Sequence, residues 1–293
     1  MGKSVVYFLL VFAAIVWGMS FILTKELFTS EPHITVFIIL TFRLAVASVV
    51  TIPTLLLIKK LEPVAKGDLK WFLLLALCEP FIYSICETSG VQLVSGSMAS
   101  IIVATIPLFV PFGMAAVYHE KIQALTLAGI ALSLIGLWVM MGGGTHNMDA
   151  SVAGIAWLAA AVAIAVVFTI VLVKLVKKYK PFTITAYQNL LGCIYFIPLM
   201  LICDGAKLPL LSYSPKMWLM LLTLGIFCST LAYVFYNIGV ARLGASAASI
   251  FTNAIPVFSL ITALIIGQET FAWAKPIGIA IVLTGVTLAQ RKQ

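Results

Sequence analysis

Three polar side chains in the segment 70–89 could carry the chemistry of this chain. Glu79, Tyr83 and Glu87 follow one another at intervals of four residues in an otherwise apolar stretch. On a helix this spacing places the three side chains on one face. A carboxyl inside a bilayer is costly and faces a cavity or a partner rather than lipid. The spacing therefore predicts a polar face that lines a cavity, with Glu79 at mid-depth and Glu87 nearer the outer mouth.

Arg43 is the expected partner of this face. It lies in the segment 34–58, about 14 Å from the outer end at 1.5 Å per helical residue, which is the depth of Glu79. We predict that Arg43 and Glu79 form an ion pair. Two interpretations stay open: the pair belongs to a transport or proton site, or it is a structural contact between packed helices. If a proton is coupled to transport, Glu79 is the residue expected to carry it.

Other polar residues in apolar segments are candidates for substrate contact. Tyr233, Tyr236 and Asn237 share one helical face by their spacing and are expected to meet the Glu79 face. The alternative for the tyrosines is ordinary packing or a place in the interfacial aromatic belt. The remaining candidates are Trp17, Ser20, Ser100, Tyr187 and Asn253.

Two prolines are predicted to kink their helices. Pro107 and Pro256 occupy equivalent places in two apolar segments. Proline removes a backbone N–H and releases the carbonyl four residues earlier. Such a site is either a hinge with a ligand-facing carbonyl or a static kink.

Enzymatic and metal-binding motifs are missing from the sequence. The three histidines, His33, His119 and His146, lie near segment ends, and no HExxH, GxSxG or Walker A pattern occurs. The five cysteines form no CxxC. We therefore expect no metal, no cofactor and no direct use of ATP.

The elements that must position these residues are membrane-spanning helices. Hydrophobic residues make up 62% of the chain and charged residues only 10%, against about a quarter charged in soluble domains. A helix needs about 20 mostly apolar residues to cross a bilayer. Ten segments qualify: 4–24, 34–58, 70–89, 96–118, 123–142, 152–174, 183–203, 217–238, 245–267 and 273–290. The formal net charge of +8 lies between these segments and forms no basic face, so we expect a lipid bilayer rather than nucleic acid as partner.

The second half of the chain repeats the first with an offset of 149 residues. Gly90–Gly136 aligns with Gly239–Gly285 without a gap, and 15 of these 47 positions are identical. Each half holds five segments, and an odd number inserts the second copy upside down. The sequence thus predicts an all-α integral membrane protein built from two inverted five-helix repeats, 1–149 and 150–293, that form one membrane domain.

Lysine and arginine counts predict the orientation. With the N-terminus in the cytoplasm, thirteen of these residues fall in inner loops and termini and four on the outer side. Because inner loops carry the excess of positive charge, we expect both termini in the cytoplasm and the cytoplasmic membrane as location.

Several motifs recur in order and spacing along the chain. They are Trp17-Gly18-Met19-Ser20-Phe21, Arg43, Ile106-Pro107-Leu108-Phe109 with its repeat Ile255-Pro256-Val257-Phe258, the glutamates Glu120 and Glu269, and the glycines Gly129, Gly136, Gly278 and Gly285. The chain resembles the EamA-type branch of the drug/metabolite transporter superfamily over essentially its whole length. The resemblance implies a ten-helix bundle with a cavity lined mainly by its first, third, fourth, sixth, eighth and ninth helices.

The expected function is transport. The resemblance implies a secondary active carrier that moves a small metabolite, often an amino acid and frequently outward, by alternating access. A proton-coupled exporter of drugs or organic cations is the alternative, and a membrane-embedded enzyme or a non-transporting scaffold belongs to other classes. Expected partners are the substrate and protons. The glycine pairs, seven residues apart on one face, predict close helix packing within the subunit or in a homodimer.

Overall fold

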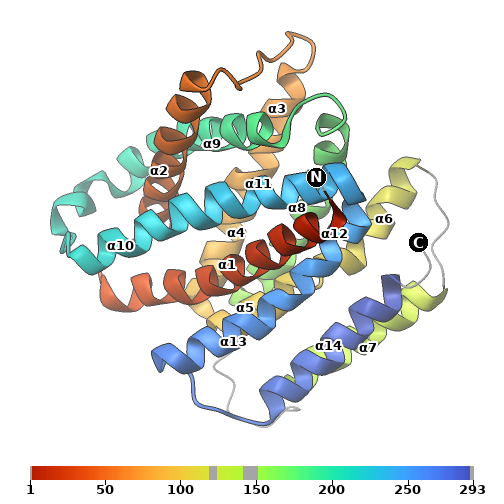
Figure 1. Cartoon of the computed structure of the whole chain (residues 1–293). Coiled ribbons are helices and arrows are strands. Elements are labelled where there is room, and N and C mark those ends of the chain that lie inside the picture. Colours follow the sequence, from red (N-terminus) through yellow and green to blue (C-terminus); the bar gives the residue numbers. More distant parts are fainter. Residues whose placement is uncertain (1, 119–123, 141–150, 291–293) are drawn as a thin grey trace.

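The structure, a computed structural model, describes residues 2–118, 124–140 and 151–290, and this part of the chain is built of helices without a strand (Figure 1). The first repeat contains α1 (Lys3–Ser30), α2 (Val36–Leu57), α3 (Leu69–Ala76), η1 (Leu77–Ile82), α4 (Tyr83–Leu93), α5 (Gly96–Val103), α6 (Ile106–Tyr118) and α7 (Ala124–Met140). The second contains α8 (Val152–Leu175), α9 (Pro181–Asp204), η2 (Gly205–Leu210), α10 (Pro215–Thr223), η3 (Leu224–Ala232), α11 (Tyr233–Leu243), α12 (Ala245–Ser249), η4 (Ile250–Ala254), α13 (Ile255–Ile266) and α14 (Ala274–Gln290).

Seven helical stretches of the described chain are long and apolar enough to cross a membrane. They are Lys3–Ser30, Val36–Leu57, Leu69–Leu93, Gly96–Val117, Val152–Leu175, Pro181–Leu210 and Pro215–Leu243. The other three expected segments correspond to α7, to α12–η4–α13 and to α14, which are shorter helices. The predicted all-α fold of ten segments is confirmed.

The two repeats break their helices at equivalent places. A π-helical stretch, η1, interrupts the third segment, and the offset of 149 places it inside η3, the π-helical stretch of the eighth segment. In the first repeat the break falls at Glu79, whose backbone is extended (φ −141°, ψ 121°), just before Pro80. Because Pro80 offers no N–H to the preceding turn, the helix cannot continue regularly through this point.

The bundle is organised as two lobes that the repeat relates to each other. In what we call the α8 lobe, α3, η1, α4, α5 and α6 pack against α8. In the α1 lobe, η3, α11, η4 and α13 pack against α1. The offset maps α1 onto α8, α4 onto α11 and α6 onto α13, so each lobe mixes elements of both repeats. Each lobe therefore has one helix from one repeat and two segments from the other.

Two further helix pairs flank the lobes, α2 with α9 and α7 with α14 (Figure 1). Close approach of α7 and α14 depends on glycine. A Cβ added at Gly285 would lie 2.4 Å from Ser133 Oγ, and one at Gly136 would lie 2.7 Å from Val282 N. These glycines serve packing within the chain.

Candidate functional site

A cavity lies between the two lobes. Side chains from the first, second, third, fourth, sixth, eighth and ninth segments line it: Trp17, Ser20, Phe21, Arg43, Glu79, Tyr83, Glu87, Val103, Ile106, Pro107, Val110, Ala165, Phe168, Thr169, Tyr233, Tyr236, Ser249, Thr252 and Ile255. Aromatic and aliphatic walls surround a few polar groups, which is the composition of a small-molecule site.

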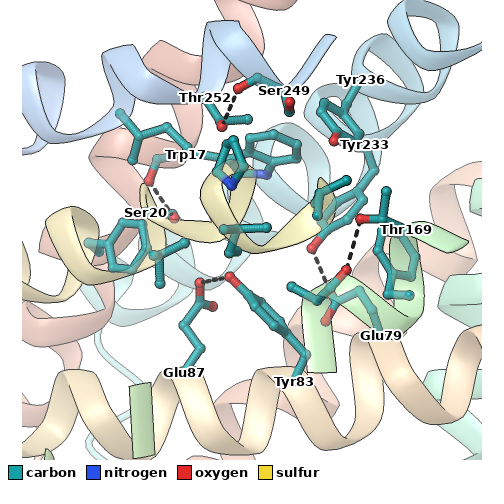
Figure 2. A pocket seen from close by; sticks show the side chains of 18 of the residues that line it. Trp17, Ser20, Glu79, Tyr83, Glu87, Thr169, Tyr233, Tyr236, Ser249 and Thr252 are labelled. Carbon is teal, nitrogen blue, oxygen red and sulfur yellow. Dashed lines mark hydrogen bonds between the residues drawn. The ribbon is translucent and has the colours of Figure 1, made fainter. Parts of the chain in front are cut away.

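Two tyrosine–carboxyl pairs lie in this cavity, and both carboxyls come from the same stretch, η1–α4 (Figure 2). Tyr83 Oη donates to Glu87 Oε1 at 2.7 Å, one helical turn along α4. Tyr233 Oη donates to Glu79 Oε1 at 2.5 Å and so joins the α1 lobe to the α8 lobe. Ser84 Oγ also donates to Glu79, at 3.3 Å from Oε2. Glu79 is only 4% exposed, and these hydroxyl donors compensate for its burial.

Trp17 forms the centre of an aromatic group in the cavity. Its ring centroid lies 5.2 Å from that of Tyr233 and 5.4 Å from that of Tyr236. The indole Nε1 donates to the backbone carbonyl of Cys228 at 3.3 Å, and Ser20 Oγ donates to the carbonyl of Trp17 at 2.7 Å. The bond to Cys228 fixes the indole, whose ring faces the cavity (Figure 2).

The predicted ion pair between Arg43 and Glu79 is not formed. Both residues line the cavity, but none of the ion pairs within 4.0 Å in the described chain includes Arg43. Arg43 Nε instead donates to Ser229 Oγ at 2.5 Å. The helix break at Glu79 turns this carboxyl toward Tyr233 and Ser84, a direction that depth in the membrane does not determine.

Other candidates lie outside the cavity lining, namely Ser100, Tyr187, Asn237, Asn253 and Pro256. Tyr187 packs edge-on against Phe72, with ring centroids 5.6 Å apart. Asn237 is fully buried and donates to Thr185 Oγ1 at 3.0 Å. Asn237 follows Tyr236 in α11, and a step of one residue turns its side chain to another face of the helix.

The helix restarts at equivalent residues before both prolines. In the first repeat α5 ends at Val103 and α6 begins at Ile106; in the second η4 ends at Ala254 and α13 begins at Ile255. Pro107 lines the cavity, whereas Pro256 does not. The two prolines thus stand at interruptions of matched helices but in different surroundings.

Sequence reasoning missed several residues that line the cavity, above all Thr169 and Ser249. Thr169 is the repeat equivalent of Ser20, and Ser249 is the equivalent of Ser100. Applying the offset to each first-repeat candidate would have found both. Thr169 Oγ1 donates to the carbonyl of Ala165 at 2.8 Å, so it meets the cavity with a satisfied hydroxyl.

Among the described residues, no group of three or more His, Cys, Asp or Glu side chains could hold a metal ion. Glu120, His119 and His146 lie outside the described residues. Glu269, the repeat equivalent of Glu120, accepts from Ser97 Oγ at 2.7 Å and from Lys275 Nζ at 2.8 Å. It therefore ties helix ends together, away from the cavity.

Two curated proteins similar to this chain over most of its length are transporters by name. It is 29% identical over 267 residues to the uncharacterized transporter YetK of Bacillus subtilis, covering 89% of this chain and 81% of that protein. An uncharacterized transporter of Archaeoglobus fulgidus is 26% identical over 280 residues, 94% of this chain and 95% of its own. One crystal structure superposes with a TM-score of 0.72 over 98% of this chain and 97% of the other at 18% identity, a likeness of fold.

A family model matches the chain twice, over residues 4–142 and 152–290. The two matches follow the same duplication that relates the lobes around the cavity. The chain belongs to the EamA-like transporter family.

Proposed function

We propose that this protein is a secondary active transporter that moves a small metabolite across the cytoplasmic membrane by alternating access, with the cavity between the lobes as its substrate site. The observation that carries the proposal is the placement of two carboxyls, Glu79 and Glu87, on one wall of a cavity bounded by both lobes. Two related lobes that rock about a shared site can expose it to either side in turn. An amino acid or related compound moved outward is the substrate that the family resemblance favours.

Glu79 is the proposed carrier of a coupled proton. Its carboxyl is held away from bulk water and accepts a hydrogen bond from Tyr233 of the other lobe. Protonation removes a negative charge and changes that bond, so the proton affects a contact between the parts that move. Proton uptake and lobe movement are then linked by one group, as coupling requires.

Organic cations are the second candidate substrate class. Trp17, Tyr233 and Tyr236 gather beside the carboxyl of Glu79. Aromatic faces attract a cation, most strongly where water is excluded. A carboxyl that binds either a proton or a cation would exchange one for the other.

The test begins with a thermal-shift screen of the purified protein against amino acids, amines, sugars and nucleosides. Flux of the compound that gives the largest shift is then measured in proteoliposomes, with and without an imposed pH gradient. We expect the gradient to accelerate net flux in the wild type, and Glu79→Gln to abolish this response while exchange continues. The matched control is Glu62→Gln, which changes a loop carboxyl paired with Lys180.

Each part of the proposal has its own contrary result. Absence of flux for every compound that binds would contradict transport. A full pH response in Glu79→Gln would exclude Glu79, and a wild type indifferent to the gradient would exclude proton coupling. Selective flux of amines would favour the cation class.

The proposed orientation places both termini in the cytoplasm. Reporter fusions at residues 143 and 178 should then report opposite sides of the membrane, because the first follows five segments and the second six. The same side for both would contradict the inverted topology.

A further inference from the structure

Two lysines that the repeat makes equivalent have different partners in this structure. Lys25 of α1 and Lys174 of α8 are separated by 149 residues. Lys25 Nζ donates to the carbonyls of Val91 and Gln92, at 3.2 and 2.9 Å, at the C-terminal end of α4. Lys25 thereby crosses from the α1 lobe to the α8 lobe. A cation on the last carbonyls of a helix is stabilised by those free groups and by the helix dipole.

Lys174 stays within its own lobe. Its Nζ lies 3.5 Å from the ring centroid of Trp71, which like Lys174 belongs to a segment of the α8 lobe. The repeat equivalents of Val91 and Gln92 are Val240 and Ala241, at the end of α11 in the opposite lobe. The carbonyl of Val240 is taken by the backbone N–H of Gly244 at 3.0 Å.

The packing of the lobes has the same asymmetry. At the end of the bundle that carries Lys25, α5 packs against α1 and α13 of the other lobe, and every residue of α5 is buried. Ser259 Oγ donates to the carbonyl of Gly96 across this contact at 3.3 Å. In the described chain, the equivalent contact at the Lys174 end, between α6 and α12, is far smaller. The lobes are thus closed at the Lys25 end and separated at the Lys174 end.

We propose that Lys25 and Lys174 are alternating latches of the transport cycle. In the present state Lys25 holds the lobes together by capping α4, while Lys174 rests on Trp71. In the opposite state Lys174 leaves Trp71 and caps the end of α11 at Val240 and Ala241, and Lys25 releases α4. The inverted repeat supplies the symmetry that makes the second position available. This inference rests on the proposed alternating access but not on the substrate or on proton coupling.

The test needs no substrate. Two pairs of spin labels report the distance between the lobes in protein reconstituted in liposomes, on a Cys203→Ser background because Cys203 is the exposed cysteine. Leu93→Cys with Ile266→Cys reports the Lys25 end, and Lys177→Cys with Arg242→Cys reports the Lys174 end. All four sites are exposed.

Replacing Lys25 with Met should shift the two populations by about tenfold, since a hydrogen bond from a charged donor has that effect on an equilibrium. The distance at the Lys25 end lengthens and the distance at the Lys174 end shortens. Adding Lys174→Met should reverse most of the shift, because the opposite state then loses its own latch. Adding Lys178→Met is the matched control, since Lys178 pairs with Asp68 inside the α8 lobe, and should reverse nothing.

Three results would overturn the proposal. They are unchanged distances in Lys25→Met, a failure of Lys174→Met to reverse the shift, and an equal reversal by Lys178→Met. Lys25→Arg keeps the charge and the donors and should keep the wild-type distances, which separates the latch from misfolding. If the distances respond as expected but no compound is transported, the latches stand and the proposed function fails.

Discussion

Arg43 and Ser229 should be energetically coupled, and a double-mutant cycle measures the coupling. Arg43 is 7% exposed and Ser229 is 2% exposed, and Arg43 Nε donates to Ser229 Oγ at 2.5 Å. A hydrogen bond to a charged group contributes about 1.5–3 kcal/mol. We therefore expect Arg43→Met and Ser229→Ala together to cost about 1.5–3 kcal/mol less than the sum of the single variants.

The two single variants should lose different amounts of unfolding free energy. Arg43→Met removes the cation that lines the cavity with Glu79 and Glu87 as well as the donor to Ser229, so it should destabilise the protein more than Ser229→Ala. Ser229→Ala leaves the guanidinium in place but removes the acceptor of its Nε. Ser229→Ala should lower the free energy of unfolding by about 1.5–3 kcal/mol, the range for the loss of a hydrogen bond to a charged group.

The assay is equilibrium unfolding of the purified protein in detergent micelles at neutral pH, with the free energy of unfolding as the quantity compared. A control cycle pairs Arg43→Met with Thr230→Val, because Thr230 Oγ1 donates to the carbonyl of Gly225 rather than meeting Arg43. That cycle should show coupling below about 0.5 kcal/mol. Coupling of that small size between Arg43 and Ser229 would refute the reasoning. A larger coupling of Arg43 with Glu79→Gln than with Ser229→Ala would restore the ion pair predicted from the sequence.

Two further predictions concern packing and pH. Gly285→Ala should destabilise the protein by about 1–3 kcal/mol, because the new Cβ would lie 2.4 Å from Ser133 Oγ. Gly205→Ala is the control and should not destabilise it, because its Cβ meets open space. Equal thermal midpoints of the two variants would contradict this prediction. Burial raises the pKa of Glu269, but hydrogen bonds from Lys275 and Ser97 outweigh it and hold the pKa below the ordinary 4.5. A carboxyl with a lowered pKa stabilises the fold above its unfolded value and loses this as the pH falls through the folded one. The excess stability of the wild type over Glu269→Gln should thus be complete above about pH 4.5 and disappear at lower pH, and a gap independent of pH in thermal unfolding would count against it.

The spans and the duplication could be predicted from the sequence because both leave strong local signals. A run of about 20 apolar residues has few alternatives to a membrane helix. The offset of 149 survives in paired residues such as Pro107 and Pro256. The polar face of Glu79, Tyr83 and Glu87 could also be predicted from the sequence, since the spacing of these residues alone places them together. All three line the cavity.

The hydrogen-bond partner of Arg43 could not be predicted from its depth in the membrane. Regular helix geometry places Glu79 at the level of Arg43, but the helix is not regular at that point. Pro80 follows Glu79 within a π-helical stretch, and the backbone of Glu79 is extended. A break of this kind rotates the side chains before it relative to those after it. Pro80 was the signal in the sequence that a regular helix was a poor assumption there.

The sequence does not predict which end of the bundle is closed, because the repeat places equivalent residues at both ends. Ser100 and Ser249 are identical residues at equivalent positions, with Ile101 and Ile250 following them. Ser249 lines the cavity, while Ser100 is fully buried in α5 and donates to the carbonyl of Ser97 at 2.6 Å. In the proposed alternating access the lobes exchange roles when the opposite end closes, and a duplicated sequence then encodes both environments for both serines. The residue that lines the cavity is therefore a property of the state, and in the opposite state the same reasoning places Ser100 at the cavity and Ser249 in the closed contact.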